Sequence, residues 1–335
     1  MMHRLLLLLT LLCGFNVAVA QEIPVRKTAS GMLIIGRGDS LRAVSPFSGS
    51  HERAIDYAEA VNAYQRTFPH ARIFCMVIPT AVAFYCPESA EQWTQNQPMA
   101  ERQIYDHLSE SVVSVSLFDT LQAHANEPIY SRTDHHWAPL GAFYAARTFA
   151  AAAGVPFADL SAYDAHVVHH YVGTMAKFAR DLSVRNAPED FVYYTPRDVE
   201  YRTTYVRYTL SRGRRSVVSE SDEQEGPFFY DYPDGSSSAY LCFMHGDDCV
   251  TTVQTSTHNG RRLLILKDSF GNALPGYLFH SFEEICVVDC RYFTQNIIDF
   301  ATAHSITDIL FANNISHAYA PATASMYQTY LIQQR

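Results

Sequence analysis

Short apolar runs alternate with amphipathic segments along most of the chain, and the spacing of the apolar residues predicts the elements. Between residues 51 and 68, Ala54, Tyr57, Ala58 and Val61 recur at the spacing of one helix face. Apolar runs of strand length, bounded by turn residues, predict buried strands. The predicted helices cover residues 51–68, 98–113, 139–153, 272–279 and 295–304, and the predicted strands residues 71–78, 114–118, 263–266, 285–288 and 309–312.

This alternation of helices with buried strands is typical of an α/β fold. We expect a three-layer sandwich in which helices cover both faces of a mostly parallel sheet of about five strands. Residues 193–259 differ, because Tyr, Thr and Ser dominate and turn signals occur at residues 233–235 and 259–260. We interpret this stretch as an antiparallel β insertion within one domain that covers residues 21–335.

The first twenty residues have the pattern of a secretory signal peptide. Arg4 precedes an apolar run, and Ala18-Val19-Ala20 has the small residues of a cleavage site. The apolar run is short for a membrane span, and no later segment reaches eighteen apolar residues. We therefore predict an exported protein, periplasmic or extracellular, without a membrane span after cleavage.

Composition excludes two classes of protein. Apolar residues make up 48% of the chain and charged residues 18%, which is unlike a disordered chain. A net charge of −9 argues against a nucleic-acid partner, since binding to phosphates needs a basic excess.

Six cysteines remain after the predicted cleavage, an even number that permits three disulfides in an exported protein. Cys242 and Cys249 could close a short hairpin. The alternative is that several are small buried apolar residues, above all Cys75 and Cys286, which lie in apolar runs.

Candidate chemistry follows from what comes directly after each strand, because ligands of parallel α/β sheets bind beyond the carboxyl ends of the strands. Asp268 and Ser269 follow the strand at 263–266, and Asp134, His135 and His136 follow a short extended piece at 129–131. Arg291 follows the strand at 285–288, and Asn313 follows the last strand. This set of groups suits a nucleophilic hydrolase or an acyltransferase.

Ser269 would be the nucleophile, since it lies at a strand-to-helix turn where Gly271 permits a tight bend. A serine hydroxyl needs a base, and the base needs an acid that fixes its tautomer. His136 and Asp134, two residues apart, can supply both. Each residue also has a simpler interpretation, because Asp134 can cap the helix that begins near Pro139 and a single histidine is more often packed than catalytic.

Two segments resemble a known family. Residues 133–137, Thr-Asp-His-His-Trp, and the later segment at residues 264–272, Leu-Ile-Leu-Lys-Asp-Ser-Phe-Gly-Asn, resemble the bacterial DHHW family and the SGNH-hydrolase-like alginate O-acetylation proteins. Residues 75–87 and 288–293 also fit the DHHW pattern. The resemblance spans roughly residues 32–314 and implies an SGNH- or flavodoxin-like fold.

The resemblance implies acetyl transfer to, or removal from, a polysaccharide of the bacterial envelope by a Ser269–His136–Asp134 triad. Arg291 would lie at the mouth of the site. The other candidates for substrate or oxyanion binding are Asn313, Gly246, Asp268 and His135. The expected partner is the polysaccharide or acetylated glycan, and an envelope protein complex is a second expected partner. No cofactor or metal is expected.

Two alternatives remain open at this point. The first is a non-catalytic glycan-binding or polysaccharide-assembly protein on the same fold, for which a run of tyrosines at residues 193–208 would offer a stacking surface. The second is a metal-dependent hydrolase, because His166, His169 and His170 have the spacing of metal ligands on a helix.

Overall fold

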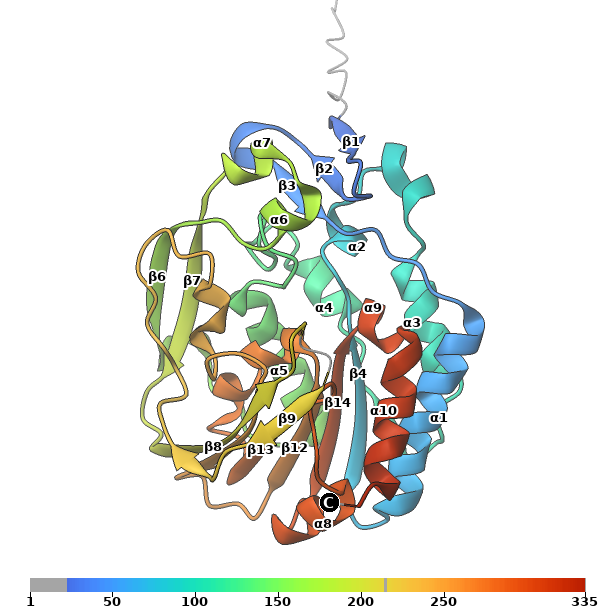
Figure 1. The fold of residues 1–335 in the computed structure, drawn as a ribbon, viewed down its shortest axis with the longest axis vertical. Helices are drawn as coiled ribbons and strands as arrows, with labels where there is room; N and C mark the ends of the chain where they lie inside the picture. The colour runs from blue at the N-terminus through green and yellow to red at the C-terminus, as the bar shows by residue number, and fades with distance from the viewer. Residues whose placement is uncertain (1–22, 214–215, 335) are drawn as a thin grey trace, which may run out of the picture.

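A mixed nine-stranded sheet forms the centre of the molecule (Figure 1). The computed structural model describes residues 23–213 and 216–334, so the predicted signal peptide at residues 1–20 lies outside the described residues. In spatial order the strands are β10 (Gln224–Glu225), β8 (Tyr201–Leu210), β11 (Cys249–Thr255), β13 (Glu284–Asp289), β12 (Arg262–Lys267), β14 (Asp308–Asn314), β4 (Arg72–Ile78) and β5 (Val112–Ser114), and β9 (Val217–Glu220) pairs with β8.

The prediction of a mostly parallel sheet of about five strands is therefore confirmed only in part. The pairs β13–β12, β12–β14, β14–β4 and β4–β5 are parallel, whereas β11, β8, β9 and β10 join by antiparallel pairing. The sheet is larger than expected and mixed because strands of the predicted insertion extend it.

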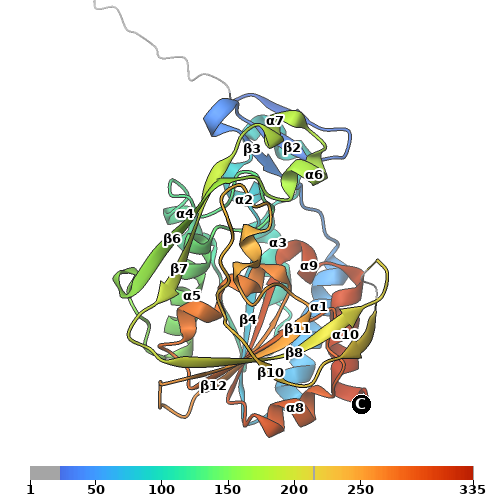
Figure 2. The same ribbon diagram turned by 60° about the vertical axis from the view of Figure 1, so that its left-hand side comes forward.

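Helices cover both faces of the sheet because alternate side chains of the central strands face opposite layers. Phe311 of β14 packs edge-on against Tyr64 of α1, while Phe74 of the neighbouring β4 packs against Phe149 of α5. The α-helices are α1 (His51–Thr67), α2 (Val82–Tyr85), α3 (Gln97–Tyr105), α4 (Phe118–Ala123), α5 (Pro139–Ala153), α6 (Met175–Ala179), α7 (Leu182–Arg185), α8 (Ile297–Ala303), α9 (Ile315–Ala318) and α10 (Pro321–Ile332). Figures 1 and 2 show α1, α3 and α10 on one side of the sheet and α5 on the other.

The segment at residues 193–259 does not form a separate layer. Its strands β8 and β11 run in full register along the edge of the parallel part. Strand β7 (Glu189–Pro196), with which the segment begins, instead pairs with β6 (Tyr163–Tyr171) in a two-stranded sheet beside the main one. Strand β6 was not expected from the sequence.

A small cap lies over one end of the sheet, at the top of Figures 1 and 2. It consists of β1 (Val25–Lys27), β2 (Leu33–Ile35), β3 (Arg42–Val44), α6 and α7, and has an apolar cluster of its own. Members of that cluster come from both parts of the cap: Ile34, Leu41, Ala43, Met175, Ala179, Val184 and Ala187. The cap thus joins two segments that are far apart in the sequence.

Most predicted elements correspond to observed ones, with two shifts. The predicted helix at 98–113 ends at Tyr105, and the strand expected at 114–118 lies at Val112–Ser114. Residues 272–279 form 3₁₀ turns, η5 (Ser269–Ala273) and η6 (Pro275–Leu278), instead of an α-helix, as a Pro-Gly pair at 275–276 would favour. None of the helices in the described part of the chain combines the length and hydrophobicity that a membrane span needs.

The six cysteines that the structure describes are unpaired thiols. None of the six within residues 23–213 and 216–334 forms a disulfide, so the expectation of disulfides is not met there. Cys75, Cys249 and Cys286 lie inside three different strands, where neighbouring side chains enclose them. Burial raises the pKa of the Cys75 thiol, which is consistent with the alternative that these residues act as small apolar side chains.

Asn313 belongs to the core and not to the substrate-binding set predicted for it. Its side chain is fully buried, and its Oδ1 accepts hydrogen bonds of 2.7 Å from both Tyr57 of α1 and Tyr327 of α10. Asn313 therefore ties two helices of one layer to strand β14.

We predict that Asn313→Ala lowers the free energy of unfolding by about 3 kcal/mol, because it leaves two buried tyrosine hydroxyls without their acceptor. Urea unfolding followed by circular dichroism measures the change. The exposed Asn186 provides the control, and we expect Asn186→Ala to cost at most about 0.5 kcal/mol. Equal costs for the two variants would contradict the structural role assigned to Asn313.

Candidate active site

Ser269 stands at the first position of the turn that follows β12, at the carboxyl edge of the parallel strands. Asp268 caps this turn, since its Oδ1 accepts from the N–H of Phe270 at 2.8 Å. The turn is tight because the backbone of Gly271 packs directly against the side chain of Lys267. A Cβ at Gly271 would stand 2.5 Å from the Cβ of Lys267, so only glycine fits this approach.

The Asp-His-His-Trp segment lies in a loop that a bridge between Tyr130 and Trp137 closes. Glu189 of β7 holds the start of this loop, because its carboxylate accepts from the backbone N–H groups of Arg132 and Thr133 at 2.7–2.9 Å. The indole N–H of Trp137 donates to the carbonyl of Phe270 at 2.9 Å. The tryptophan therefore fastens the loop directly to the turn that carries Ser269.

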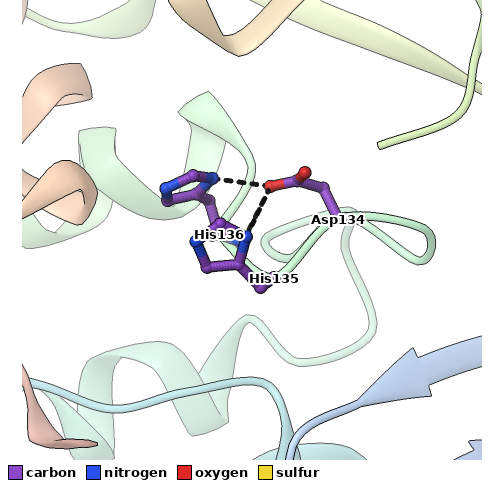
Figure 3. Close-up of side chains that lie close together, drawn as sticks. All are labelled: Asp134, His135 and His136. Atoms are coloured by element: carbon purple, nitrogen blue, oxygen red, sulfur yellow. Dashed lines mark hydrogen bonds and ion pairs between the residues drawn. The ribbon is translucent and has the colours of Figure 1, made fainter. Parts of the chain in front are cut away.

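Ser269, His136 and Asp134 form a continuous chain of hydrogen bonds. The Oγ of Ser269 lies 2.8 Å from Nε2 of His136, and Nδ1 of His136 lies 2.6 Å from Oδ1 of Asp134 (Figure 3 shows the Asp134–His136 contact). Because a carboxylate only accepts, Nδ1 carries the proton and Nε2 is free to accept the serine proton. This is the arrangement that general-base activation of a serine requires.

Asp134 is held in its ionised form. Burial alone would raise its pKa, but the imidazole groups of His136 and His135 and the backbone N–H of Thr174 hold the pKa of Asp134 well below its usual range. The second carboxylate oxygen accepts from both the N–H and the Oγ of Thr174, each at 2.8 Å. With both oxygens engaged, the carboxylate has one orientation.

Aromatic contacts hold the ring of His136. Tyr240, in the 3₁₀ turn η4 (Ala239–Cys242), stacks on this ring at 3.8 Å between centroids with 5° between the planes. The Tyr240 hydroxyl donates toward the carbonyls of Ser269 and Phe270, each at 3.0 Å. Tyr240 thus positions both the base and the backbone of the nucleophile.

His135 lies on the other side of the His136 ring, with 3.7 Å between centroids. Its Nδ1 lies 2.6 Å from the Oγ of Thr174, and since that hydroxyl gives its proton to Asp134, Nδ1 of His135 is the donor. Burial and the neighbouring His136 lower the pKa of His135 to about 3, so His135 is neutral near pH 7.

A cavity of about 260 Å³ opens beside the triad. Asp134, His135 and Phe270 form its wall toward the triad, so it lies on the His135 side of the catalytic groups. The rest of the lining comes from the cap, from the residues after β4 and from α9: Ala43, Val44, Ser45, Thr80, Ala81, Val82, Asn314, Ser316, His317 and Ala320. Apolar residues form much of this surface, with hydroxyl, amide and imidazole groups between them.

Arg291 is part of an ion cluster next to the nucleophile turn. It binds Asp289 through two hydrogen bonds of 2.7 Å and Asp247 through one of 2.8 Å. Lys267, which is fully enclosed, donates to the same two carboxylates. Burial alone would lower the pKa of Lys267, but both carboxylates raise it above its usual value. The side chain of Arg291 stays 31% exposed and is not among the residues that line the cavity.

Three other residues predicted to bind substrate or an oxyanion make hydrogen bonds within the protein instead: Gly246, Asp268 and Asn313. Gly246 donates its N–H to the carbonyl of Phe243, so this N–H does not serve an oxyanion. Asp268 is saturated, because its Oδ2 accepts from the backbone and the side chain of Asn314. Asn313 points into the core, and its neighbour Asn314 is the residue that lines the cavity.

His166, His169 and His170 do not form the metal site that their spacing suggested. They lie on strand β6, where His166 meets Thr195 and His169 meets Asp190. Asp134, His135 and His136 do place three ligand atoms within 4.8 Å of one another (Figure 3). These atoms are engaged with one another and with Thr174, which matches the donor and acceptor pattern of a proton relay.

The DHHW protein family model matches residues 26–288, which is more than half of the chain. The chain belongs to the DHHW family. The family tetrapeptide is thus the segment that supplies the carboxylate and the imidazole of the hydrogen-bonded chain and, through Trp137, contacts the turn that carries Ser269.

Solved structures agree with this assignment. A DHHW family protein from Eubacterium siraeum is 34% identical, with a TM-score of 0.82 and coverage of 93% of this chain and 99% of the other. Bacillus cereus PatB1 with a sulfonyl adduct is 15% identical and has a TM-score of 0.68, with coverage of 92% of this chain and 99% of the other. The PatB1 structure without the adduct is also 15% identical and has a TM-score of 0.64, with coverage of 91% of this chain and 99% of the other. PatB1 shares the fold. No curated protein matches the chain.

Several residues of the site were missed from the sequence. Thr174 and Tyr240 lie 38 and 104 residues beyond His136 in segments without a recognisable motif. Glu189 stands in a stretch that is otherwise ordinary β sequence. The cap residues Ala43 and Val44 form one wall of the cavity, where the pairing of β3 with β2 and a hydrogen bond of 2.9 Å from the N–H of Ala43 to the carbonyl of Arg132 hold them.

A substitution of Gly173 tests whether the reactivity of Ser269 depends on the position of the Asp134 carboxylate. A Cβ at this position would stand 2.4 Å from both Cβ and Oδ2 of Asp134, so Gly173→Ala must displace the carboxylate. We predict that the rate at which phenylmethylsulfonyl fluoride modifies Ser269, followed by mass spectrometry, falls roughly 100-fold, as misplacement of a catalytic group by about 1 Å does elsewhere.

The matched control is Gly226→Ala, whose Cβ would stand 3.2 Å from Tyr205, away from the triad. We expect this variant to react at nearly the wild-type rate. An unchanged rate in a folded Gly173→Ala protein would show that the carboxylate does not have to occupy the observed position.

Proposed function

We propose that the protein is an exported serine acyl-ester enzyme of the SGNH type, an O-acetyltransferase or acetylesterase that acts on a polysaccharide of the bacterial envelope or outside it. The observation that carries the proposal is the hydrogen-bonded chain from Ser269 through His136 to Asp134 beside a cavity. The DHHW family membership and the PatB1 sulfonyl adduct support it, since sulfonyl electrophiles are attacked by activated nucleophiles.

In the first half-reaction, Oγ of Ser269 attacks the ester carbonyl of an acetyl donor while Nε2 of His136 takes the serine proton. Asp134 stabilises the imidazolium that forms, because its Oδ1 lies 2.6 Å from Nδ1. The protonated His136 then gives its proton to the leaving alcohol, and an acetyl-serine remains. Tyr240 and His135 hold the imidazole plane between them throughout.

In the second half-reaction, a hydroxyl attacks the acetyl-serine and His136 again acts as base. If the hydroxyl belongs to a glycan the reaction is transfer, and if it belongs to water the reaction is hydrolysis. The negative charge on the carbonyl oxygen needs donors near Ser269. The N–H of Ser269 is suited to this role, since it precedes the first hydrogen-bonded turn of η5. The predicted donors are engaged elsewhere, because the N–H of Gly246 donates to Phe243 and the Nδ2 of Asn313 donates to the Sγ of Cys290 at 3.9 Å.

The cavity fits the proposed substrate class. Its apolar surface suits an acetyl methyl group, and Ser45, Thr80 and Asn314 add polar groups that could bind sugar hydroxyls. Export by the predicted signal peptide would bring the enzyme to envelope polysaccharide, in contact with an envelope protein complex. The triad chemistry uses no cofactor.

We predict that the protein releases p-nitrophenol from p-nitrophenyl acetate and that Ser269→Ala and His136→Ala each lower kcat at least about 1000-fold, because each removes a member of one catalytic unit. Ser325→Ala and His70→Ala, at exposed positions, are the matched controls and should keep wild-type rates. Absorbance of p-nitrophenol gives the rate, and circular dichroism verifies folding.

Equal rates near background for all five proteins would rule out a simple esterase. Acetyl-serine formation measured by mass spectrometry with an activated acetyl ester would then separate the remaining possibilities. An acetyl group on Ser269 without turnover identifies a transferase that awaits its glycan. Absence of this adduct favours the non-catalytic glycan-binding alternative.

A further inference from the structure

A second group of converging metal-ligand side chains lies far from the triad. Glu284 and Cys286, two residues apart on β13, point to the same face of the sheet, and His304 at the end of α8 lies over them. A carboxylate oxygen, Sγ and a ring nitrogen lie within 4.8 Å of one another. Figures 1 and 2 show α8 at the end of the molecule opposite the cap.

The atoms of these three side chains that would bind a metal already lie close to one another. Oε1 of Glu284 lies 2.7 Å from Nδ1 of His304 and 3.7 Å from Sγ of Cys286. Glu284 and Cys286 are buried, and the side chain of His304 is 26% exposed. One opening toward solvent remains, on the side of the imidazole.

Neighbouring side chains form a second layer around Glu284. Arg262 stands beside it on β12 and donates to Oε2 at 3.2 Å, which leaves Oε1 directed at the other two ligands. On β11, Thr252 lies opposite Cys286 and Gln254 opposite Glu284. Carboxylates that bind metals are commonly oriented by such outer hydrogen bonds, so the contact with Arg262 fixes the geometry of the ligand.

An acidic groove leads to the group. It has a volume of about 740 Å³ between β8, β11 and α8, and both His304 and Thr252 belong to its lining. Asp222, Glu223 and Asp299 also line it. Carboxylates along a groove raise the local concentration of cations, so the groove gives a divalent ion a path to the ligands.

We propose that Glu284, Cys286 and His304 form a binding site for a single Zn²⁺ ion, with the fourth position open to the acidic groove. Thiolate, imidazole and carboxylate are the three ligand types that zinc prefers in proteins, and small side-chain rotations bring them to about 2.0–2.3 Å from one ion. The site is independent of the proposed acyl-transfer chemistry.

Binding has a defined proton balance. The Cys286 thiol loses its proton to solvent as the S–Zn bond forms. Nδ1 of His304, which donates to Oε1 of Glu284 in this structure, gives up its proton and Nε2 takes one from solvent, so that Nδ1 can bind the ion. The ion would join β13 to the end of α8. That end leads directly into β14, one of the strands next to the nucleophile strand β12.

Cobalt absorption tests the proposal with the full-length mature protein after treatment with a chelator. We expect one equivalent of Co²⁺ to give a thiolate-to-cobalt charge-transfer band in the near ultraviolet, which Zn²⁺ removes. Cys286→Ser should lose the band, whereas Cys249→Ser, a buried cysteine on the adjacent strand β11, should keep it. The triad group contains no sulfur, so its binding of cobalt would not give this signal.

His304→Ala is a second variant in case Cys286→Ser does not fold, because His304 is partly exposed. We expect it to weaken Zn²⁺ binding by at least about tenfold in competition with a chromophoric chelator. Absence of the charge-transfer band in the wild type, or its survival in folded Cys286→Ser, would overturn the proposal. Glu284 and His304 would then be members of an ion-pair network with Arg262.

Discussion

Parallel pairing of β12 with β13 on one side and β14 on the other sets the geometry of the candidate site. It brings the carboxyl ends of three strands to one edge, so that Asp268 can bind Asn314 and Lys267 can bind Asp289 across neighbouring strands. These contacts fix the turn that presents Ser269. The nucleophile owes its position to the sheet, and the local sequence contributes the glycine that makes the turn possible.

The loop with the family tetrapeptide is held from three directions. Glu189 binds its backbone at the start, Thr174 binds the Asp134 carboxylate, and Trp137 fastens its end to the Ser269 turn. Tyr240 adds a stacking surface for the imidazole. Each tie comes from a different part of the chain, which explains how a loop without regular structure can hold a base and an acid at hydrogen-bond distance.

Two groups of potential metal-ligand side chains in the described part of the chain lie at opposite ends of the sheet. The triad lies beneath the cap, and the Glu284–Cys286–His304 group lies beside α8. The two groups differ in the chemistry of their polar atoms. In the triad the polar atoms pair as donor and acceptor along one line, as proton transfer requires. The second group also contains hydrogen bonds, but it combines a thiol, a carboxylate and an imidazole, the three ligand types that zinc prefers.

The alternation of elements and the three residues of the hydrogen-bonded chain were predictable from the sequence, because apolar periodicity is a local property and a motif lies within a few residues. Helix α5 begins at Pro139 and ends at Ala153, as its pattern predicts, and Ser269 and His136 do meet. Tertiary structure alone decided that β8 and β11 enlarge the main sheet and that Asn313 faces the core while Asn314 faces the cavity. It also decided where the cap lies. These outcomes depend on strand register and on contacts between residues far apart in the chain, and no local pattern encodes them.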